Sequence, residues 1–425
     1  MSANRAEPRL LIYSQDGLGL GHLRRTTLLA GEFLKSRPGS SVLTISDSPI
    51  GQFFDAHPGH DYLKLPSIRK VSPGNWQPLS LAQPFPDVLA MRREVIRTAA
   101  LGFRPDVLLV DHMPHGAMGE LIPTLEVLER WGARMVLGLR DILDAPATVR
   151  RRWRMEGAFK AVERYYEQVL VYGSRDVFDV AAQYGWPTEL AERLRYCGYV
   201  CAPPALSGAA AVRRRYLGED QNARLVVAMA GGGADASKLF STLLRALPAL
   251  ETDHRHVVVV VTGPFLPDED RARLEDLACG LPVHLIPTVG ESGSYLAAAD
   301  LVVAMAGYNT TAEILSIGVR ALLVPRSGPS AEQQMRARSF ADRGWVRWVQ
   351  PDTLDPDTLA TAMASAMGTT AGRGTVAPDL LGRQRAAGHL LHGWGRRPAN
   401  AASDLVSSSA IAEPLEVSPR LLGEG

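Results

Sequence analysis

The sequence predicts an α/β protein built from two doubly wound domains that face a central cleft. Three observations favour this fold class. Short apolar runs of strand length alternate with longer helical stretches along most of the 425 residues. Most runs are apolar at successive positions, as expected of parallel strands that helices cover on both faces. A stretch rich in Pro, Ala, Ser and Gly, residues 199–208, separates two series of similar length.

The first series predicts a domain over residues 1–200. Its expected strands are residues 9–14, 41–46, 107–111, 135–139 and 168–172. Helices are expected between them, for example over residues 23–35 and 119–131. Residues 65–86 are rich in proline and interrupt the alternation, so we expect a surface excursion there.

The second series predicts a domain over residues 219–395, after a linker at 201–218. Its expected strands are residues 224–230, 256–262, 283–286, 301–304 and 321–324. Helices are expected over residues 235–247 and 309–315. Residues 396–425 lose the periodicity and are rich in Ala, Ser, Pro and Glu, so they are predicted to be disordered.

Composition excludes several classes of protein. A formal net charge of +1 argues against a polycationic nucleic-acid binder. Three cysteines with no Cys-x-x-Cys spacing argue against a disulfide scaffold and a structural zinc site, although a bridge between Cys197 and Cys201 stays open. Apolar runs such as residues 257–261 fall far short of the ~20 residues of a membrane span. Residues 1–8 lack the apolar region of a signal peptide, so a soluble cytoplasmic protein is expected.

A glycine-rich turn follows the first expected strand. Gly17, Gly19 and Gly21 precede a helix, whose N-terminus carries partial positive charge and suits an anion. The spacing is not that of dinucleotide-binding enzymes, and no Walker lysine is present. A tight strand-to-helix turn without a ligand explains the glycines equally well. We expect Gly19 and Gly21 to lie on the side of the cleft formed by the first domain, facing a phosphate or an acceptor molecule.

A second glycine turn, Gly231–Gly232–Gly233, follows the first strand of the second domain. Ligands of open α/β sheets collect at the carboxyl ends of the strands, so both turns should face one cleft. Asp235 would repel a phosphate, and we expect it to cap the following helix instead.

The most informative segment runs from Asp300 to Arg326 and continues from Ser330 to Arg336. It reads DLVVAMAGYNTTAEILSIGVRALLVPR and then SAEQQMR. The segment resembles the donor-nucleotide signature of GT-B glycosyltransferases, specifically the MurG-like group (glycosyltransferase family 28). Together with Gly21-His22 the resemblance reaches both domains; it is strong over residues 281–337 and thin over 49–104. The chain also resembles a group of bacterial glycosyltransferases of unassigned specificity.

The resemblance implies two Rossmann-like domains and a set of donor-binding residues. Implied contacts are Gly307, Asn309, Thr310 and Thr311 with the diphosphate, Glu313 with the ribose hydroxyls, Thr288 and Val289 with the nucleobase, Gln333 and Gln334 with the sugar, and Gly231, Gly232 and Gly233 near the diphosphate. Alternatives stay open, because Glu313 could be an exposed helix carboxylate and the glutamines a solvated helix start. Asp235 and Ala337 depart from the family pattern.

Inverting glycosyl transfer needs a base for the acceptor hydroxyl and a stabilised leaving diphosphate. His22 is the candidate base, because it ends the first glycine turn and an imidazole can accept a proton near neutral pH. Asp111, at the end of a strand, is expected to orient His22 or to replace it as the base. Their structural alternatives are a histidine that fixes the turn and an aspartate that caps a strand end. Arg25 is expected to face an acceptor phosphate, with solvation at the surface as the alternative.

The predicted function is transfer of a sugar from a nucleotide-diphosphate donor, UDP by family resemblance, to a small-molecule, glycan or lipid-linked acceptor. Asp-x-Asp pairs at 268–270 and 355–357 stand at expected helix starts, so they predict solvated caps and a metal-independent enzyme without a cofactor. No nucleic-acid partner is expected, and contact with a membrane surface and the oligomeric state are left open. The alternatives are a nucleotide-sugar hydrolase or epimerase of the same fold and a non-catalytic nucleotide-sugar sensor.

Overall fold

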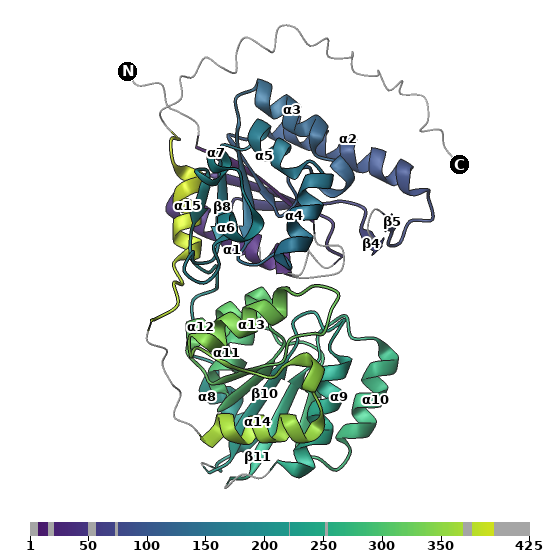
Figure 1. The fold of residues 1–425 in the computed structure, drawn as a ribbon, viewed down its shortest axis with the longest axis vertical. Helices are drawn as coiled ribbons and strands as arrows, with labels where there is room; N and C mark the ends of the chain where they lie inside the picture. Colours follow the sequence, from purple (N-terminus) through teal and green to yellow (C-terminus); the bar gives the residue numbers. More distant parts are fainter. Residues whose placement is uncertain are drawn as a thin grey trace, which may run out of the picture.

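The chain folds into two α/β lobes that lie one above the other and join at one edge (Figure 1). The computed structural model describes residues 7–15, 21–49, 57–72, 75–220, 222–250, 254–368 and 376–394. Gly19 and the predicted disordered tail, residues 396–425, lie outside these described residues. The two predicted doubly wound domains are confirmed.

The N-terminal lobe contains a seven-stranded parallel sheet of order β3-β2-β1-β6-β7-β8-β9. Its strands are β1 (Arg9–Ser14), β2 (Ser41–Ser46), β3 (His60–Lys64), β6 (Val107–Asp111), β7 (Arg134–Arg140), β8 (Gln168–Tyr172) and β9 (Leu194–Tyr196). Its helices are α1 (Gly21–Ser36), α2 (Phe85–Phe103), η2 (Ala117–Gly119), α3 (Ile122–Arg130), α4 (Pro146–Met155), α5 (Ala158–Tyr165), α6 (Val180–Tyr184) and α7 (Thr188–Ala191). The predicted excursion forms the antiparallel pair β4 (Ile68–Ser72) and β5 (Asn75–Pro78).

The C-terminal lobe contains a six-stranded parallel sheet of order β12-β11-β10-β13-β14-β15. Its strands are β10 (Arg224–Met229), β11 (His256–Val261), β12 (Val283–Ile286), β13 (Leu301–Ala304), β14 (Ala321–Leu323) and β15 (Arg347–Trp348). Its helices are α8 (Ala209–Leu217), α9 (Ser237–Ala246), η3 (Leu247–Ala249), α10 (Asp268–Ala278), α11 (Ser292–Ala298), α12 (Tyr308–Ile317), α13 (Glu332–Asp342), η4 (Pro351–Thr353) and α14 (Pro356–Gly368).

Each sheet reverses its strand order beside its first strand. In the N-terminal lobe β1 lies between β2 and β6, and in the C-terminal lobe β10 lies between β11 and β13. The crevice at the carboxyl end of such a reversal is the usual ligand site of an open α/β sheet. Ser14 pairs with Asp111 at one reversal and Met229 with Ala304 at the other. The second glycine turn, which follows Met229, therefore leaves its sheet at such a point.

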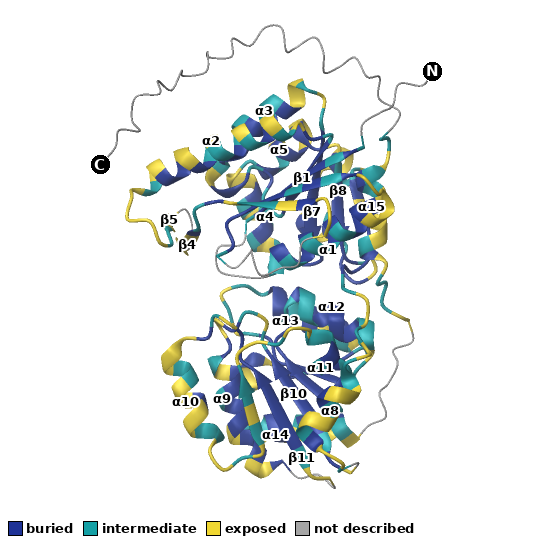
Figure 2. Ribbon diagram, turned by 180° about the vertical axis from the view of Figure 1, so that it is seen from behind, coloured by how far each residue is buried: buried dark blue, intermediate teal, exposed yellow. Residues whose placement is uncertain are grey.

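Burial follows the double winding. Along β1, Leu10 and Ile12 enter one hydrophobic cluster while Leu11 and Tyr13 enter another, because alternate residues of a strand point to opposite faces. The central strands are buried, and the outward faces of the helices are exposed (Figure 2). The first of these clusters also contains residues of the C-terminal lobe, among them Val227, Tyr308 and Phe340, so the two lobes share apolar contacts as well as chain crossings.

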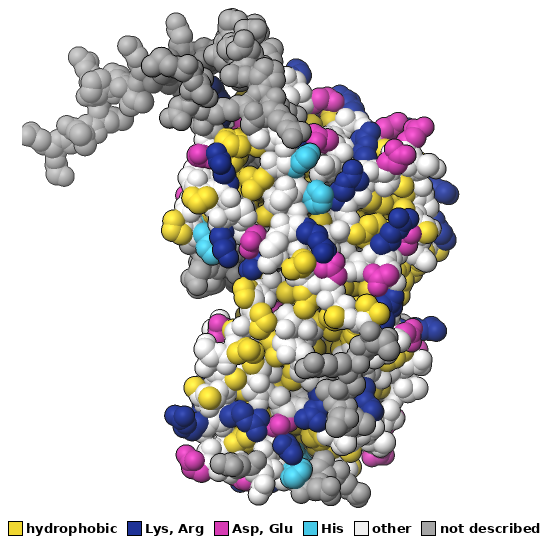
Figure 3. Space-filling model, turned by 90° about the vertical axis from the view of Figure 1, so that its left-hand side faces the viewer, with side chains coloured by type: hydrophobic (Ala, Val, Ile, Leu, Met, Phe, Trp, Pro, Cys, Tyr) yellow, Lys and Arg dark blue, Asp and Glu magenta, His cyan; other side chains and the backbone are white. Residues whose placement is uncertain are grey.

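Two chain segments cross between the lobes side by side, where the space-filling outline narrows to a waist (Figure 3). The Tyr199 N–H donates to the Asp379 carbonyl at 2.7 Å, and the Gly382 N–H donates to the Tyr199 carbonyl at 3.2 Å. A Cβ on Gly382 would lie 2.4 Å from the Gly198 carbonyl oxygen, so only glycine fits this crossing. The second segment continues into α15 (Gly382–Leu391), which packs on α1 of the N-terminal lobe.

Some element boundaries differ from the expectation. Residues 209–217, inside the predicted linker, form α8 and pack on α11. The predicted helix over 119–131 begins only at Ile122, because Met118 and Gly119 have positive φ angles of 50° and 75°. The short edge strands β3, β9 and β15 were not expected. All three cysteines are free, which closes the possibility of a Cys197–Cys201 bridge.

Within the described ranges, none of the helices combines the length and the apolar character that a membrane crossing needs.

Candidate active site

A histidine–aspartate pair stands at the strand reversal of the N-terminal lobe. His22 lies in the first turn of α1 and Asp111 is the last residue of β6. Nδ1 of His22 lies 2.7 Å from Oδ2 of Asp111, and Nη2 of Arg25 donates to the same oxygen at 2.6 Å. The carboxylate is buried, while the His22 side chain is 18% exposed. The fold thus brings together the two residues that the sequence assigned to catalysis.

The charges fix how this pair is protonated. Burial pushes the pKa of Asp111 upward, but Arg25 and His22 outweigh it and hold that pKa below its usual value. Asp111 is therefore a carboxylate, and the Nδ1–H of His22 donates to it. Nη2 of Arg25 also lies 3.0 Å from Nδ1 of His22, because both nitrogens donate to Oδ2 of Asp111. A neutral ring then has its lone pair at Nε2, where it can accept a proton. This geometry favours Asp111 as the orienting group and His22 as the base.

Arg25 is committed to the interior of the lobe. Its side chain is 2% exposed, and its guanidinium lies over the rings of Tyr172 and Tyr308 at 5.4 and 5.3 Å from their centroids. Its charge neutralises Asp111, so the guanidinium does not lie open to an acceptor phosphate as the sequence led us to expect. The neighbouring Arg24 is the one that contacts the C-terminal lobe, at Glu313 and Ser292.

His112 belongs to the same site, although no role was assigned to it from the sequence. Its φ of 80° is unusual for a residue other than glycine, and its ring centroid lies 5.4 Å from that of His22. Burial, followed by the charges of Arg140 and His22, holds the pKa of His112 well below its usual value. His112 is therefore neutral. The signal in the sequence was its place directly after Asp111 at a strand end.

Buried polar atoms without a hydrogen-bond partner gather at this edge of the sheet. They include Ser14 Oγ, Asp111 Oδ1, His112 Nδ1 and the hydroxyl of Tyr172. Three strands, β1, β6 and β8, end at or directly before these residues. Because buried polar groups are nearly always satisfied, this cluster marks an edge prepared for water or a ligand.

The second strand reversal presents the N-terminus of α12. Asn309 Nδ2 donates to the carbonyl of Gly21 at 3.0 Å, so this end of α12 lies against the start of α1. Neither helix has an acidic residue in its first turn. Two helix N-termini with partial positive charge therefore meet, and neither helix has a carboxylate in its first turn. This arrangement suits a bound anion. Thr311 is buried and donates to the carbonyls of Gly307 and Tyr308 at 2.9 Å each, whereas Thr310 is half-buried.

Glu313 is buried, in contrast to the exposed helix carboxylate that the sequence left open. Its Oε2 accepts from the Ser292 hydroxyl at 3.0 Å, and its Oε1 pairs with Arg24 of the N-terminal lobe. Burial raises the pKa of Glu313, and Arg24 and Ser292 offset that rise only in part. Thr288 and Val289, expected at the nucleobase, lie in the loop that leads to Ser292, with Thr288 exposed and Val289 half-buried. The expected nucleobase and ribose contacts are therefore neighbours.

The second glycine turn is pressed against the loop after β11. A Cβ on Gly233 would lie 2.1 Å from the Thr262 carbonyl oxygen, and Gly231 and Gly233 have φ angles of 63° and 89°. Gly232 lies under the ring of Phe265. The glycines thus have a packing role besides any contact with a ligand.

Asp235 does not cap α9, so that expectation was wrong. The N-cap position is Ala236, and Asp235 pairs with Arg326 at 2.6 Å. The pairing neutralises a carboxylate that would otherwise repel a diphosphate.

The two glutamines differ in burial. Gln333 is buried, and its Oε1 accepts from the backbone N–H of Arg326 at 3.3 Å, so it is not a solvated helix start. Gln334 is half-buried on the next position of α13.

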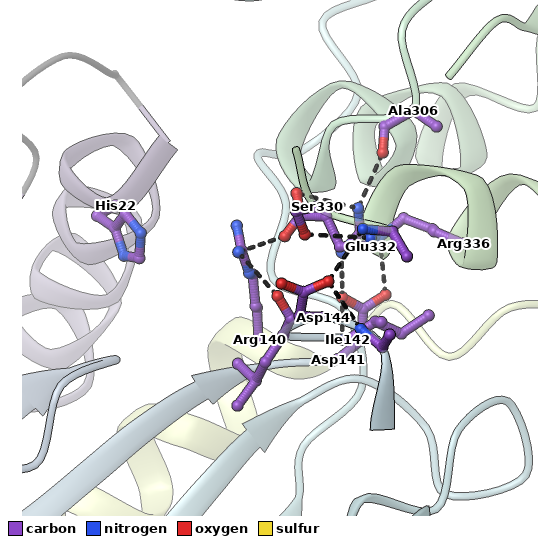
Figure 4. Close-up of polar contacts among 12 residues, drawn as sticks. His22, Arg140, Asp141, Ile142, Asp144, Ala306, Ser330, Glu332 and Arg336 are labelled. Atoms are coloured by element: carbon purple, nitrogen blue, oxygen red, sulfur yellow. Dashed lines mark hydrogen bonds and ion pairs between the residues drawn. The ribbon is translucent and has the colours of Figure 1, made fainter. Parts of the chain in front are cut away.

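Buried ion pairs hold the start of α13 against the end of β7 (Figure 4). Arg336 donates from Nε and Nη2 to the two oxygens of Asp141 at 2.9 and 2.6 Å, and from Nη1 to the Ala306 carbonyl at 2.8 Å. Arg140 pairs with Glu332 beside it. None of these pairings across the lobes was expected from the sequence, because the partners are far apart along the chain.

The Asp-x-Asp pairs are helix starts, as expected. Asp268 and Asp270 lie in the first turn of α10, and Asp355 caps α14 by accepting from the Thr358 N–H at 2.8 Å. Among the described residues, no three His, Cys, Asp or Glu side chains come together as a metal site would require.

Comparisons with known proteins agree with this geometry. Residues 226–370 match the model of the glycosyltransferase family 28 C-terminal domain, so the resemblance seen in the sequence is confirmed for that region. The chain is 35% identical over 149 residues to a Burkholderia mallei protein named UDP-N-acetylglucosamine–N-acetylmuramyl-(pentapeptide) pyrophosphoryl-undecaprenol N-acetylglucosamine transferase. That match spans 34% of this chain and 40% of the relative.

Solved structures share the whole two-lobed fold. Acinetobacter baumannii MurG is 15% identical, with a TM-score of 0.53 over 94% of this chain and 98% of that one. A glycosyltransferase from Rickettsia africae is 11% identical, with a TM-score of 0.57 over 91% and 94%. A UDP-GlcNAc 2-epimerase from Methanocaldococcus jannaschii is 10% identical, with a TM-score of 0.58 over 91% and 100%. The protein therefore has the GT-B fold, and residues 226–370 are similar to the C-terminal domain of glycosyltransferase family 28.

Proposed function

We propose that the protein is a glycosyltransferase that moves a sugar from a nucleotide-diphosphate donor to an acceptor hydroxyl, with inversion at the anomeric carbon and without a metal ion. One observation carries this proposal. The His22–Asp111 pair of one lobe lies at the start of α1, and that start contacts the N-terminus of α12 in the other lobe through the 3.0 Å bond from Asn309 to Gly21. A base and an anion site therefore adjoin across the cleft.

The donor is held by the C-terminal lobe in this proposal. The amide groups at the start of α12 receive the diphosphate, and Thr310 adds a hydroxyl. Glu313 receives the ribose hydroxyls beside the nucleobase loop at Thr288 and Val289. Gln334 is the better candidate for the sugar, since Gln333 already accepts a backbone hydrogen bond.

The reaction needs opposite charges to develop on the two faces of the sugar. As the bond to the diphosphate breaks, the anomeric carbon gains oxocarbenium character and negative charge grows on the leaving phosphate. The two helix N-termini stabilise that charge. On the other face, His22 takes the proton of the acceptor hydroxyl at Nε2, and Asp111 stabilises the imidazolium that forms.

The family match lies in the donor half, so it bears on the donor more than on the acceptor. The name of the Burkholderia mallei relative makes UDP-N-acetylglucosamine the first donor to test. That relative is named for an acceptor on pyrophosphoryl-undecaprenol. We leave the acceptor of this chain as a small molecule, a glycan or a lipid-linked sugar. The proposal includes a cytoplasmic location, which a tagged protein would test.

The first experiment is a thermal-shift and calorimetry screen of UDP, GDP, dTDP and their sugars. A ligand at about 100 times its dissociation constant should add ~2.7 kcal/mol of stability. Failure of every nucleotide to bind would refute the proposal.

Product analysis then separates the alternatives. With donor alone, rapid release of free sugar would indicate a hydrolase, and a change of configuration at C2 an epimerase. A transferase consumes donor rapidly only when an acceptor is added. A non-catalytic sensor would show no activity that depends on His22 or Asp111.

A further inference from the structure

Arg24 makes an unusual contact between the lobes. It lies in the first turn of α1, with 35% of its side chain exposed, yet it pairs with Glu313, whose side chain is only 7% exposed. Nη2 of Arg24 also donates to the Ser292 hydroxyl at 2.7 Å. The same hydroxyl donates to Glu313, so the three side chains close a ring of polar contacts.

This ring occupies the carboxylate that the proposed function assigns to the ribose. Arg24 holds one oxygen of Glu313, and Ser292 holds the other. The carboxylate is almost completely covered, so a ribose diol cannot take both oxygens while the guanidinium stays in place. A nucleotide must therefore move Arg24.

A destination for the displaced guanidinium lies within one helical turn. Arg24 is three residues from Gly21, and the carbonyl of Gly21 accepts the hydrogen bond from Asn309 at the start of α12. The side chain is long and flexible, and the two helix ends beside it carry no acidic residue in their first turns. A diphosphate held there would place its negative charge within reach of Arg24.

The neighbouring Arg25 is held in a way that does not allow the same displacement. Arg25 is 2% exposed, donates to buried Asp111 and lies over two tyrosine rings, so it is fixed in the interior. Successive residues of a helix point about 100° apart, which separates the two guanidinium groups into a fixed one and an exchangeable one.

We propose that Arg24 is a nucleotide-exchanged residue: without donor it occupies the ribose site at Glu313 and Ser292, and with donor it turns to the diphosphate. The inference rests on the proposed function and adds to it a residue of the N-terminal lobe that reads the nucleotide. A nucleoside should bind weakly, because it breaks the ion pair between Arg24 and Glu313 without offering Arg24 a new partner. A nucleoside diphosphate should bind more tightly, because its phosphates pair with the displaced Arg24.

The test compares uridine with UDP by calorimetry on the full chain. In Arg24→Ala, uridine should bind at least threefold more tightly, because its competitor is gone, and UDP should bind more weakly. The preference for UDP over uridine should therefore fall by about tenfold or more, the size expected for loss of a charged hydrogen bond. Arg24→Lys should fall between the two proteins, since it keeps the charge without the planar fork.

Arg343→Ala is the matched control. Arg343 also joins the lobes, by donating to the Asp176 carbonyl, but it lies at the far end of α13. It should leave the UDP preference unchanged. If Arg24→Ala weakens both ligands equally, alters neither, or is reproduced by Arg343→Ala, then Arg24 only joins the lobes and the proposal is wrong. If the unmodified protein binds neither uridine, UDP nor any other nucleotide, the proposed function itself fails, and this inference with it.

Discussion

The two strand reversals use the same backbone plan for different chemistry. At the N-terminal reversal, the side chains of His22, Arg25 and Asp111 form charged contacts within 2.6–3.0 Å of one another. At the C-terminal reversal, the start of α12 offers backbone amides and the hydroxyl group of Thr310, and the first carboxylate along the helix, Glu313, lies in its second turn. One reversal is suited to moving a proton and the other to holding an anion.

This contrast explains why the two halves of the sequence were not equally informative. A site made of backbone and hydroxyl groups leaves a contiguous motif, because the turn and the helix start are neighbours in sequence. A proton-transfer site is assembled from side chains on separate strands. Substitutions at each strand reversal therefore test the two kinds of site separately.

The largest effect is expected from His22→Ala. Loss of a general base should lower kcat by about 10²–10⁴-fold. The dissociation constant for UDP should change less than about threefold, since the donor is held by the other lobe. Asp111→Asn should lower kcat as well, with His22 still present but wrongly oriented. Calorimetry and a donor-turnover assay check both values. Equal losses in binding and turnover would contradict the division between the lobes.

The next effect concerns the union of the lobes. Asp141→Ala removes the carboxylate that accepts two hydrogen bonds from the buried guanidinium of Arg336, and it should lower the free energy of unfolding by about 3–5 kcal/mol. Glu94→Ala is the control: its pair with Arg97 at 2.8 Å is exposed and should be worth less than ~1 kcal/mol. Urea unfolding measures both. A small loss in Asp141→Ala would mean that the lobes stay together without this pair.

Adjacent threonines give a finer comparison within the donor side. Thr310→Val should weaken UDP binding by about five- to tenfold, a typical loss for one hydrogen bond. Thr311→Val should change it by less than about twofold, because the Thr311 hydroxyl already donates to the carbonyls of Gly307 and Tyr308. Calorimetry on the two variants decides the point. The reverse order would mean that the ligand approaches the other side of α12.

The smallest effect is on the pH dependence of nucleoside binding. The pKa of Glu313 is raised by burial, and Arg24 and Ser292 offset that rise in part. Ribose binding needs the carboxylate, so uridine affinity is fully present above this raised pKa and is lost as pH falls through it. The loss should begin at higher pH in Arg24→Ala and should disappear in Glu313→Gln. Calorimetry from about pH 8 to pH 5 measures it. The same pH profile in Glu313→Gln would exclude Glu313 as its source.

The sequence predicted the central strands well because their apolar runs, such as His256–Val261, are covered on both faces. It missed β3 and β9, which are edge strands with half-exposed, partly polar residues. The first glycine turn pointed to His22 and a strand end pointed to Asp111; the fold brings the two side chains to 2.7 Å, and their catalytic roles stay a prediction. The roles of Arg24 and Arg25 could not be distinguished, since neighbours of the same type differ only in which side of α1 they occupy. The pair of Asp141 and Arg336 joins positions 195 residues apart, and no local pattern signals it.

The crossing of two backbone segments at Tyr199 and Gly382 also ties the two lobes together at one edge. Because the backbones are hydrogen-bonded and closely packed there, a separation of the lobes would disturb this contact least if it were a rotation about that edge. Such a rotation would separate Arg336 from Asp141 and Arg24 from Glu313. Separation of the lobes is therefore infrequent, because it breaks buried ion pairs. If donor exchange requires that separation, its rate sets an upper limit on the rate of exchange.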